Sequence, residues 1–172
     1  MKVSQYGLHF IAQREGTELA EYRDKAGKLT IGVGHLLRPG ERYPNGITLA
    51  QALALLACDI ASVEREINGA VKTPLSQNEF DACASLTFNI GDGGFDGSTV
   101  HRLIDAGNFQ GAADAFLMWD KRRPAPGELV KDETTGAMRE PRPGELVADD
   151  GLLARRKLER ALFLTAGEPD AD

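Results

Sequence analysis

A predicted helix that leads directly into a predicted β-hairpin constrains this chain's fold more than any other feature. Ser4 can cap a first helix that runs to about Glu15. Residues 22–34 then have the pattern of a hairpin, with turn residues at 24–27 and a return strand of alternating character. One side of that strand is apolar, whereas the side that carries Thr30 is small and polar. We expect this second side to form an open cleft wall, although glycines at bulges of a plain amphipathic strand give the same pattern.

Two carboxyl groups flank this junction. Glu15 falls on the apolar side of the first helix, seven residues after Leu8. Asp24 lies in the polar turn of the hairpin, and Thr30 follows on the open side of the return strand. A helix that feeds directly into a hairpin can bring all three side chains around one groove. The alternative is a helix end that frays into solvent and an ordinary turn aspartate.

Different surroundings for two carboxyl groups are the expected signature of acid–base catalysis. A proton donor must stay protonated near neutral pH, which requires desolvation, and Glu15 at the end of an apolar stripe is placed for that. Asp24, in a polar turn, is placed to stay ionised. Hydrolysis of a glycosidic bond needs such a pair. Because the chain has 26 acidic residues, spacing alone leaves the catalytic and the structural interpretations open.

Helix signals dominate the remainder of the chain. Thr48 can cap a long helix through about Asn68, and residues 76–79 form a capping box for a helix toward residue 89. Ser98 and Asn108 can cap two shorter helices, and Asp150 can cap a last helix, residues 151–164.

Residues 120–150 differ in composition from their surroundings. Four prolines lie here, and Pro-Gly-Glu-Leu-Val occurs twice, at 126–130 and 143–147. We expect an irregular loop or a small hairpin with residues 134–136 at its turn. The segment is either a flap over a groove or a surface insertion that costs little in loop closure.

Charge and cysteine content exclude several classes of function. The net charge of −6 argues against nucleic-acid binding, which needs a basic face. Cys58 and Cys83 lie in apolar helical stretches, so we expect two buried free thiols, and no metal-ligand spacing surrounds either. The N-terminus lacks an apolar signal core, and no stretch is long enough to span a bilayer. We therefore expect synthesis in the cytoplasm, no membrane insertion, no metal and no cofactor.

The pattern around the three candidate residues resembles the signature of phage-type lysozymes (glycoside hydrolase family 24). The segments that carry this resemblance are residues 14–16, 22–24, 29–35, 47–52, 74–82, 88–91, 95, 98–99, 111–114, 116, 119, 155–156 and 159. They cover nearly the whole chain outside 120–150, where the family has a shorter link.

The resemblance implies an α+β, predominantly helical fold in a single domain, residues 1–172. A small hairpin lobe (about 16–47) would be joined by a linking helix (about 48–68) to a helical lobe (about 74–166) that carries the atypical insertion 120–150. The glycan would lie in the cleft between the lobes.

The resemblance also implies roles for individual residues. Glu15 matches the general acid, Asp24 the carboxylate that positions or activates water, and Thr30 its helper. The bond cut would be the β-1,4 link between N-acetylmuramic acid and N-acetylglucosamine in bacterial peptidoglycan. Because the family inverts anomeric configuration, we expect the two carboxyl groups to lie about 6.5–9.5 Å apart.

Further positions match on the same grounds. Leu36, Phe88 and Ser98 match cleft positions that touch sugar, with core packing or a helix cap as the alternatives. His35 matches a histidine that is usually structural, held by a hydrogen bond or an ion pair. Arg155 and Arg156 lie where the family places basic residues near the acid. One of them can orient Glu15, or both can be surface charges.

Two other functions fit the same residues. A lytic transglycosylase attacks the same bond with one catalytic acid, but the presence of both Asp24 and Thr30 favours hydrolysis. A lysozyme-like module that binds peptidoglycan without turnover would fit the loss of either carboxyl group, and both are present. We expect a monomer that acts in the periplasm and depends on a partner such as a holin to reach it.

Overall fold

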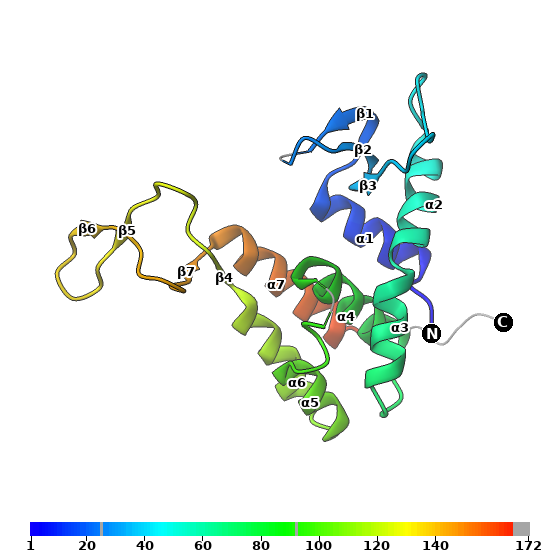
Figure 1. The fold of residues 1–172 in the computed structure, drawn as a ribbon. Helices are drawn as coiled ribbons and strands as arrows, with labels where there is room; N and C mark the ends of the chain where they lie inside the picture. Colours follow the sequence, from blue (N-terminus) through cyan, green and yellow to red (C-terminus); the bar gives the residue numbers. More distant parts are fainter. Residues whose placement is uncertain (25, 92, 167–172) are drawn as a thin grey trace.

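The computed structural model describes residues 1–24, 26–91 and 93–166, which form seven helices, one short 3₁₀ helix and seven strands among these residues (Figure 1). In chain order these are α1 (Gln5–Glu15), β1 (Glu18–Arg23), β2 (Leu29–Gly32), β3 (His35–Leu36), α2 (Leu49–Asp59), α3 (Ala61–Ala70), α4 (Gln77–Ile90), α5 (Thr99–Asp105), α6 (Phe109–Phe116), η1 (Leu117–Trp119), β4 (Lys121–Arg122), β5 (Val130–Lys131), β6 (Met138–Arg139), β7 (Val147–Ala148) and α7 (Asp150–Leu164). The predominantly helical fold with a small hairpin lobe is confirmed.

Helix α1 begins and ends where the sequence predicts. The hydroxyl of Ser4 accepts a hydrogen bond from the amide of Gly7 at 3.0 Å, which satisfies one of the free amides of the first turn. At the other end, Gly16 has a φ of +83° and its amide donates to the carbonyl of Ala12. A glycine tolerates this conformation without strain, so the chain leaves the helix immediately after Glu15.

The hairpin lobe contains a three-stranded antiparallel sheet in the order β1-β2-β3. Its small core consists of Ile31, Ile47 and Ala52, so it packs on the first turns of α2. Gly32 has a φ of +65°, and a Cβ atom there would lie 3.5 Å from Ala52. Thr30, Ile31 and Gly32 of β2 are all buried. The expectation of an open wall is therefore wrong for Thr30, which is 1% exposed.

The predicted linking helix is interrupted. Helix α2 ends at Asp59 and α3 begins at Ala61, with Ile60 between them at a ψ of −4°. No proline or glycine lies at this break. Instead, Ile60 is fully buried in the main core, and the neighbouring Asp59 carboxylate binds His35 of the hairpin lobe. We attribute the break to these two tertiary contacts rather than to local propensity.

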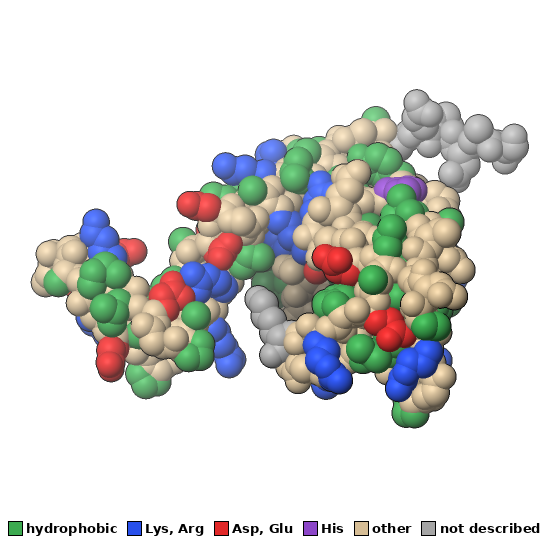
Figure 2. All heavy atoms as spheres, turned by 90° about the horizontal axis from the view of Figure 1, so that it is seen from above, with side chains coloured by type: hydrophobic (Ala, Val, Ile, Leu, Met, Phe, Trp, Pro, Cys, Tyr) green, Lys and Arg blue, Asp and Glu red, His purple; other side chains and the backbone are tan. Residues whose placement is uncertain are grey.

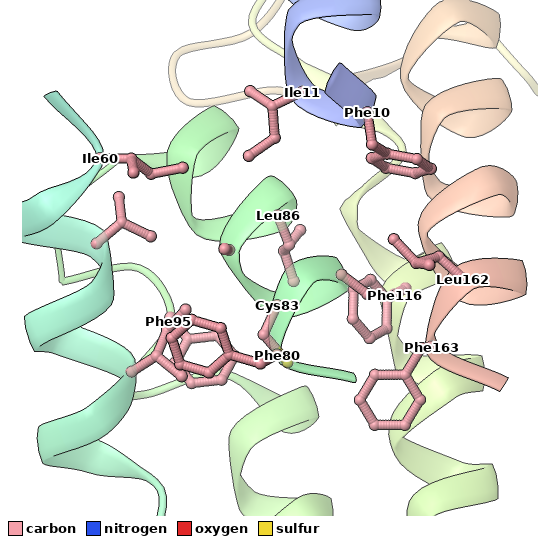
Figure 3. Close-up of a cluster of buried hydrophobic side chains, with 14 of the residues drawn as sticks. Phe10, Ile11, Ile60, Phe80, Cys83, Leu86, Phe95, Phe116, Leu162 and Phe163 are labelled. Atoms are coloured by element: carbon pink, nitrogen blue, oxygen red, sulfur yellow. The ribbon is translucent and has the colours of Figure 1, made fainter. Parts of the chain in front are cut away.

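The main core fills the helical lobe. Phe80, Cys83 and Leu86 of α4 lie at its centre, and α1 contributes Phe10 and Ile11 (Figure 3). Helix α1 therefore belongs to this lobe by packing, although it leads into the hairpin. Of the two expected buried thiols, Cys83 is buried and free, as predicted, whereas Cys58 is free but exposed.

Residues 121–148 form a narrow projection between η1 and α7, which we call the arm (Figure 1). Four two-residue strands pair in it as β4 with β7 and β5 with β6. The predicted hairpin is confirmed, with Gly136 at its turn at a φ of +73°. Asp149, one residue before the predicted cap, accepts the hydrogen bond from Leu152 that begins α7.

Candidate functional site

Glu15 is the last residue of α1, and Arg155 of α7 holds it. Nη1 of Arg155 donates to Oε1 of Glu15 at 2.5 Å. The Glu15 side chain is 27% exposed, while that of Arg155 is almost fully buried. Glu15 is therefore open to solvent on one side and contacts a fixed guanidinium group on the other. The two residues of this contact are 140 positions apart in the sequence.

Arg155 is itself fixed by groups in the helical lobe. Its Nε donates to Oε1 of Glu159 at 3.0 Å, and its Nη2 donates to the carbonyl of Ser85 at 3.0 Å. The hydroxyl of Ser85 donates to the same Glu159 oxygen at 2.7 Å. Glu159 is fully buried, and a carboxylate in such a place needs this degree of pairing to offset its lost hydration. Two acceptors, the Glu159 carboxylate and the Ser85 carbonyl, thus set the orientation of the guanidinium group that holds Glu15.

Arg156 completes this buried charge network. It is fully buried, its Nη2 donates to Oδ1 of Asn89 at 2.6 Å, and its Nη1 lies 3.2 Å from Oε2 of Glu159. Burial lowers the pKa of the Arg156 guanidinium, and the negative charge of Glu159 offsets part of that decrease. The surface-charge interpretation of Arg155 and Arg156 is wrong, and it is Arg155 that contacts Glu15.

Asp24 directly follows β1, and the hairpin loop fixes its carboxylate. Oδ1 accepts hydrogen bonds from the amides of Ala26 at 2.9 Å and Lys28 at 2.8 Å. Its own amide donates to the carbonyl of Lys28 at 2.9 Å, and Gly27 turns the chain at a φ of +78°. Two amide donors on one oxygen form an arrangement that suits a carboxylate anion. Lys25 of the predicted turn lies outside the described residues.

Thr30 is tied to the same loop. Its hydroxyl donates to the carbonyl of Lys28 at 3.1 Å, while the amide of Lys28 donates to Asp24. In the sheet Thr30 pairs with Tyr22, two residues before Asp24. The structure therefore brings Asp24 and Thr30 together around one backbone unit. Glu15 lies three residues before the start of β1, at the other end of the strand that carries Asp24 into its loop.

The three candidate sugar-contact residues have different surroundings. Leu36 is exposed on β3, where it pairs with Thr30. Phe88 of α4 packs against the main core, and Ser98 is buried as the cap of α5, accepting from the amide of His101 at 3.0 Å. Leu36 is thus accessible to a ligand, and sugar contact by all three residues stays a prediction.

His35 has the structural role that the sequence predicts. Its Nδ1 lies 2.9 Å from Asp59 on α2, and its Nε2 lies 3.3 Å from Glu41. Glu41 also accepts from the amide of Arg38 and from the hydroxyl of Tyr43. The backbone hydrogen bond from Arg38, followed by that from Tyr43, lowers the pKa of Glu41 to about 2. The His35 contacts join the hairpin lobe to the linking helices.

Sequence reasoning assigned no role to Ser85, Glu159 or Asp59. Glu159 lies four residues after Arg155, a spacing that places two side chains on one helix face and favours an ion pair. That signal was available, whereas nothing local marks Ser85, whose partner is 74 residues away.

Two structural observations bear on other site classes. No group of three or more His, Cys, Asp or Glu side chains is arranged to hold a metal ion within residues 1–24, 26–91 and 93–166. None of the helices in this described part combines the length and the apolar character needed to cross a lipid bilayer.

Comparison with known proteins finds a family match and similar curated proteins. Residues 12–136 match the model of a family described as phage lysozyme. The chain is 39% identical over 168 residues to an endolysin of Salmonella phage P22, covering 96% of this chain and 99% of the relative. It is 38% identical over 148 residues to an endolysin of Acyrthosiphon pisum secondary endosymbiont phage 1, covering 81% and 99%.

Solved structures agree with these relatives. A mutant of P22 lysozyme superposes with a TM-score of 0.77 at 38% identity, covering 96% of this chain and 99% of that one. The muramidase domain of SpmX from Asticaccaulis excentricus superposes with a TM-score of 0.75 at 31% identity, with the same coverage.

Proposed function

The chain belongs to the phage lysozyme family and is an enzyme that hydrolyses bacterial peptidoglycan, and we propose that Glu15, Asp24 and Thr30 carry out this reaction. The target is the β-1,4 bond between N-acetylmuramic acid and N-acetylglucosamine. The observation that carries the residue assignment is the pair of carboxyl groups, each fixed in a different way at the two ends of β1.

In this mechanism Glu15 protonates the leaving oxygen. Arg155 contacts Oε1, so we place the proton on Oε2 and the leaving oxygen of the glycan beside it. As the leaving group departs, Glu15 becomes an anion, and the guanidinium of Arg155 stabilises the charge that develops there. The buried Ser85–Glu159 pair keeps Arg155 in position throughout the reaction.

Asp24 directs a water molecule at the opposite face of the sugar. The loop amides hold Oδ1, which leaves Oδ2 to accept a proton from the water as it attacks the anomeric carbon. Thr30 supports this step through Lys28, because Thr30 binds the carbonyl of Lys28 while the amide of Lys28 binds Asp24. Attack by water on the face opposite the leaving group inverts the anomeric configuration, which requires a separation of about 6.5–9.5 Å between the carboxyl groups.

Turnover of purified cell walls by matched variants tests the assignment. We expect Glu15→Gln and Asp24→Asn each to lower kcat by about a hundredfold to ten-thousandfold, because each removes one proton-transfer group. Glu140→Gln, an exposed glutamate in the arm, is the control and should retain full activity. Equal clearing of permeabilised cells by the wild type and by the Glu15→Gln variant would show that Glu15 is not the acid.

We further propose that the enzyme is made in the host cytoplasm and reaches the wall through a pore formed by a partner protein such as a holin. Some relatives are named SAR-endolysins, such as the one from Bacteriophage PS34, to which the chain is 34% identical, whereas it is 39% identical to the P22 relative, which is named an endolysin. The higher identity to a relative without the SAR designation supports the pore route. Expression in a bacterium with and without a co-expressed holin tests this: lysis that is equally rapid without the holin would contradict it.

A further inference from the structure

The arm is built from two copies of one eleven-residue motif. Residues 122–132 read RRPAPGELVKD and residues 139–149 read REPRPGELVAD, so the two copies differ only at their second, fourth and tenth positions. In both copies a glycine at a φ near +80° precedes the glutamate that the copies have in common (Gly127 at 80°, Gly144 at 78°). The repeated sequence thus folds into a repeated backbone conformation.

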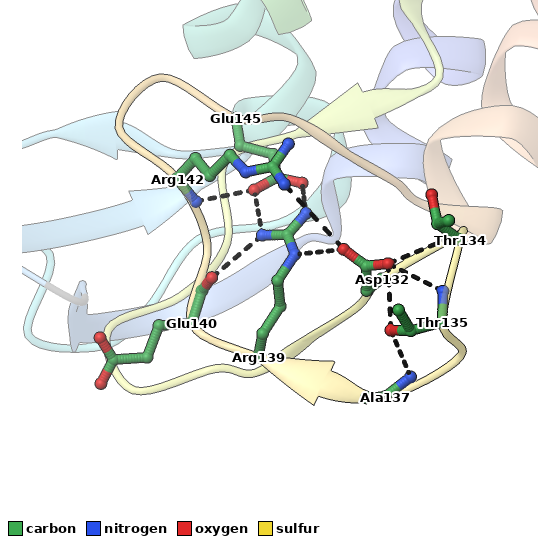
Figure 4. Close-up of polar contacts among 8 residues, drawn as sticks. All are labelled: Asp132, Thr134, Thr135, Ala137, Arg139, Glu140, Arg142 and Glu145. Carbon is green, nitrogen blue, oxygen red and sulfur yellow. Dashed lines mark hydrogen bonds and ion pairs between the residues drawn. The ribbon is translucent and has the colours of Figure 1, made fainter.

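Within each copy the first arginine binds the copy's own glutamate. Arg122 donates from Nη1 and Nη2 to the two oxygens of Glu128 at 2.7 and 2.8 Å. Arg139 does the same with Glu145 at 2.8 and 2.7 Å (Figure 4). These paired contacts are the geometry in which arginine binds carboxylate most specifically. Hydrogen bonds from Arg122 and Arg139 lower the pKa of the respective glutamates to about 2.

The two copies are also joined to each other in a reciprocal manner. Nε of Arg122 donates to Asp149, the last residue of the second copy, at 2.8 Å. Nε of Arg139 donates to Asp132, the last residue of the first copy, at 3.1 Å. The strands follow the same rule, because Arg122 pairs with Val147 and Arg139 pairs with Val130. Because each copy is paired with the other in this way, the arm has a defined structure and is not an irregular loop.

A groove of about 390 Å³ lies between the two copies. Equivalent leucines from each copy line it, Leu129 at 49% exposed and Leu146 at 52% exposed. Charges of both signs stand around them, from Lys121, Lys131 and Glu133. Large apolar side chains held open to solvent by a rigid scaffold are typical of a surface that binds a partner.

Helix α7 connects the base of the groove to the candidate catalytic site. Lys121 and Ala148 line it at the base of the arm, where they pair in the sheet. Helix α7 starts two residues later, and its Arg155 contacts Glu15. Five residues of helix separate Asp150 from Arg155, a rise of about 7.5 Å. The arm projects outward from the start of α7 (Figure 1), and Lys and Arg side chains lie beside a hollow between the arm and the body of the molecule (Figure 2).

We propose that this groove binds the stem peptide of the peptidoglycan strand whose glycan lies in the cleft. The inference rests on the proposed function. Each N-acetylmuramic acid carries a short peptide with alanine methyl groups, carboxylates and the amino group of a diamino residue. Methyl groups suit the leucine walls, and the two signs of charge suit Lys121, Lys131 and Glu133. A four-residue extended peptide spans about 13 Å, which exceeds the helical rise of about 7.5 Å between Arg155 and Asp150 at the base of the arm.

Two forms of one substrate provide the test. Purified glycan strands are compared before and after an amidase has removed their stem peptides, with kcat/KM measured on each. The test variant is the double substitution Leu129→Ser with Leu146→Ser. The control is Leu158→Ser, because Leu158 is similarly exposed on α7 and lies outside the arm.

The wild type should cleave the peptide-bearing strands faster than the stripped ones. The double variant should lose about fivefold or more of that preference, since burying the two exposed leucine side chains under a bound peptide contributes at least this much affinity. Its rate on stripped strands should stay at the wild-type level, and Leu158→Ser should retain both rates. A wild type without preference, or a double variant with an unchanged preference, would overturn the proposal.

A second measurement separates this inference from the proposed function. A soluble alanyl-glutamyl-diaminopimelyl-alanine peptide is titrated into the full chain, with the leucine methyl resonances followed by NMR. We expect shifts of the Leu129 and Leu146 methyl signals, and none in the double variant. Unmoved signals, or a doubling of mass in sedimentation that depends on these leucines, would overturn the proposal. If wild type cleaves neither glycan, the proposed function is wrong, and the titration still decides this inference.

Discussion

Replacing Glu159 with glutamine should destabilise the protein and slow catalysis through Arg155. The Glu159 carboxylate is fully buried between Arg155 and Arg156, at 3.0 and 3.2 Å from their nitrogens. Glutamine keeps the shape but removes the negative charge, which leaves two buried guanidinium groups without their shared counter-ion. Breaking a buried pair in this way costs about 3–5 kcal/mol of unfolding free energy. At the lower end, about 3 kcal/mol lowers the Tm of a chain this size by roughly 6–12 °C.

Thermal unfolding and steady-state kinetics on cell walls measure the two effects of Glu159→Gln. We expect a fall in kcat with little change in KM, because Arg155 acts on Glu15 rather than on the bound sugar. Lys157→Gln is the matched control: Lys157 is exposed on the same helix, so its replacement should leave both Tm and kcat near wild type. A Glu159→Gln variant with wild-type Tm and wild-type kcat would refute the idea that Glu159 holds Arg155 in place.

Two further predictions concern the hairpin lobe. Gly32→Ala should lower the unfolding free energy by about 1–2 kcal/mol in urea titration, because Gly32 has a φ of +65° and faces Ala52, and unchanged stability would contradict this strain. Because the pKa of Glu41 is lowered to about 2 in the folded state, its contribution to stability is present above its ordinary pKa near 4.5 and is lost as pH falls toward 2. Glu41→Gln should therefore make stability less dependent on pH in that window, and an unchanged pH profile of Tm would count against it.

Local signals predicted the starts of several helices well. The hydroxyls of Ser4, Thr48 and Ser76 all cap their helices as expected, because a cap depends only on residues within the next turn. The break at Ile60 and the burial of Thr30 could not be predicted in this way. The break depends on contacts of Ile60 with elements that lie far away in sequence, and no local pattern marks the burial of Thr30.

The candidate site was likewise predicted only in part from the sequence. The resemblance placed Glu15 and Asp24 and pointed to Arg155 or Arg156 near the acid, but only the structure shows which arginine contacts Glu15. Ser85 became part of the site through a tertiary contact with Glu159 that no local pattern marks. The repeat in the arm was visible in the sequence. Its crossed ion pairs were not, because each arginine selects an aspartate from the other copy.

The anomeric configuration of the newly formed reducing end tests the central claim most directly. ¹H NMR of fresh digests, recorded before mutarotation, follows the new N-acetylmuramic acid end as the β-1,4 bond is cut. If Glu15 protonates the leaving oxygen while Asp24 directs water from the opposite face, the first product is the α-anomer. A first product in the β configuration, or an anhydro-muramic end without water addition, would contradict the account.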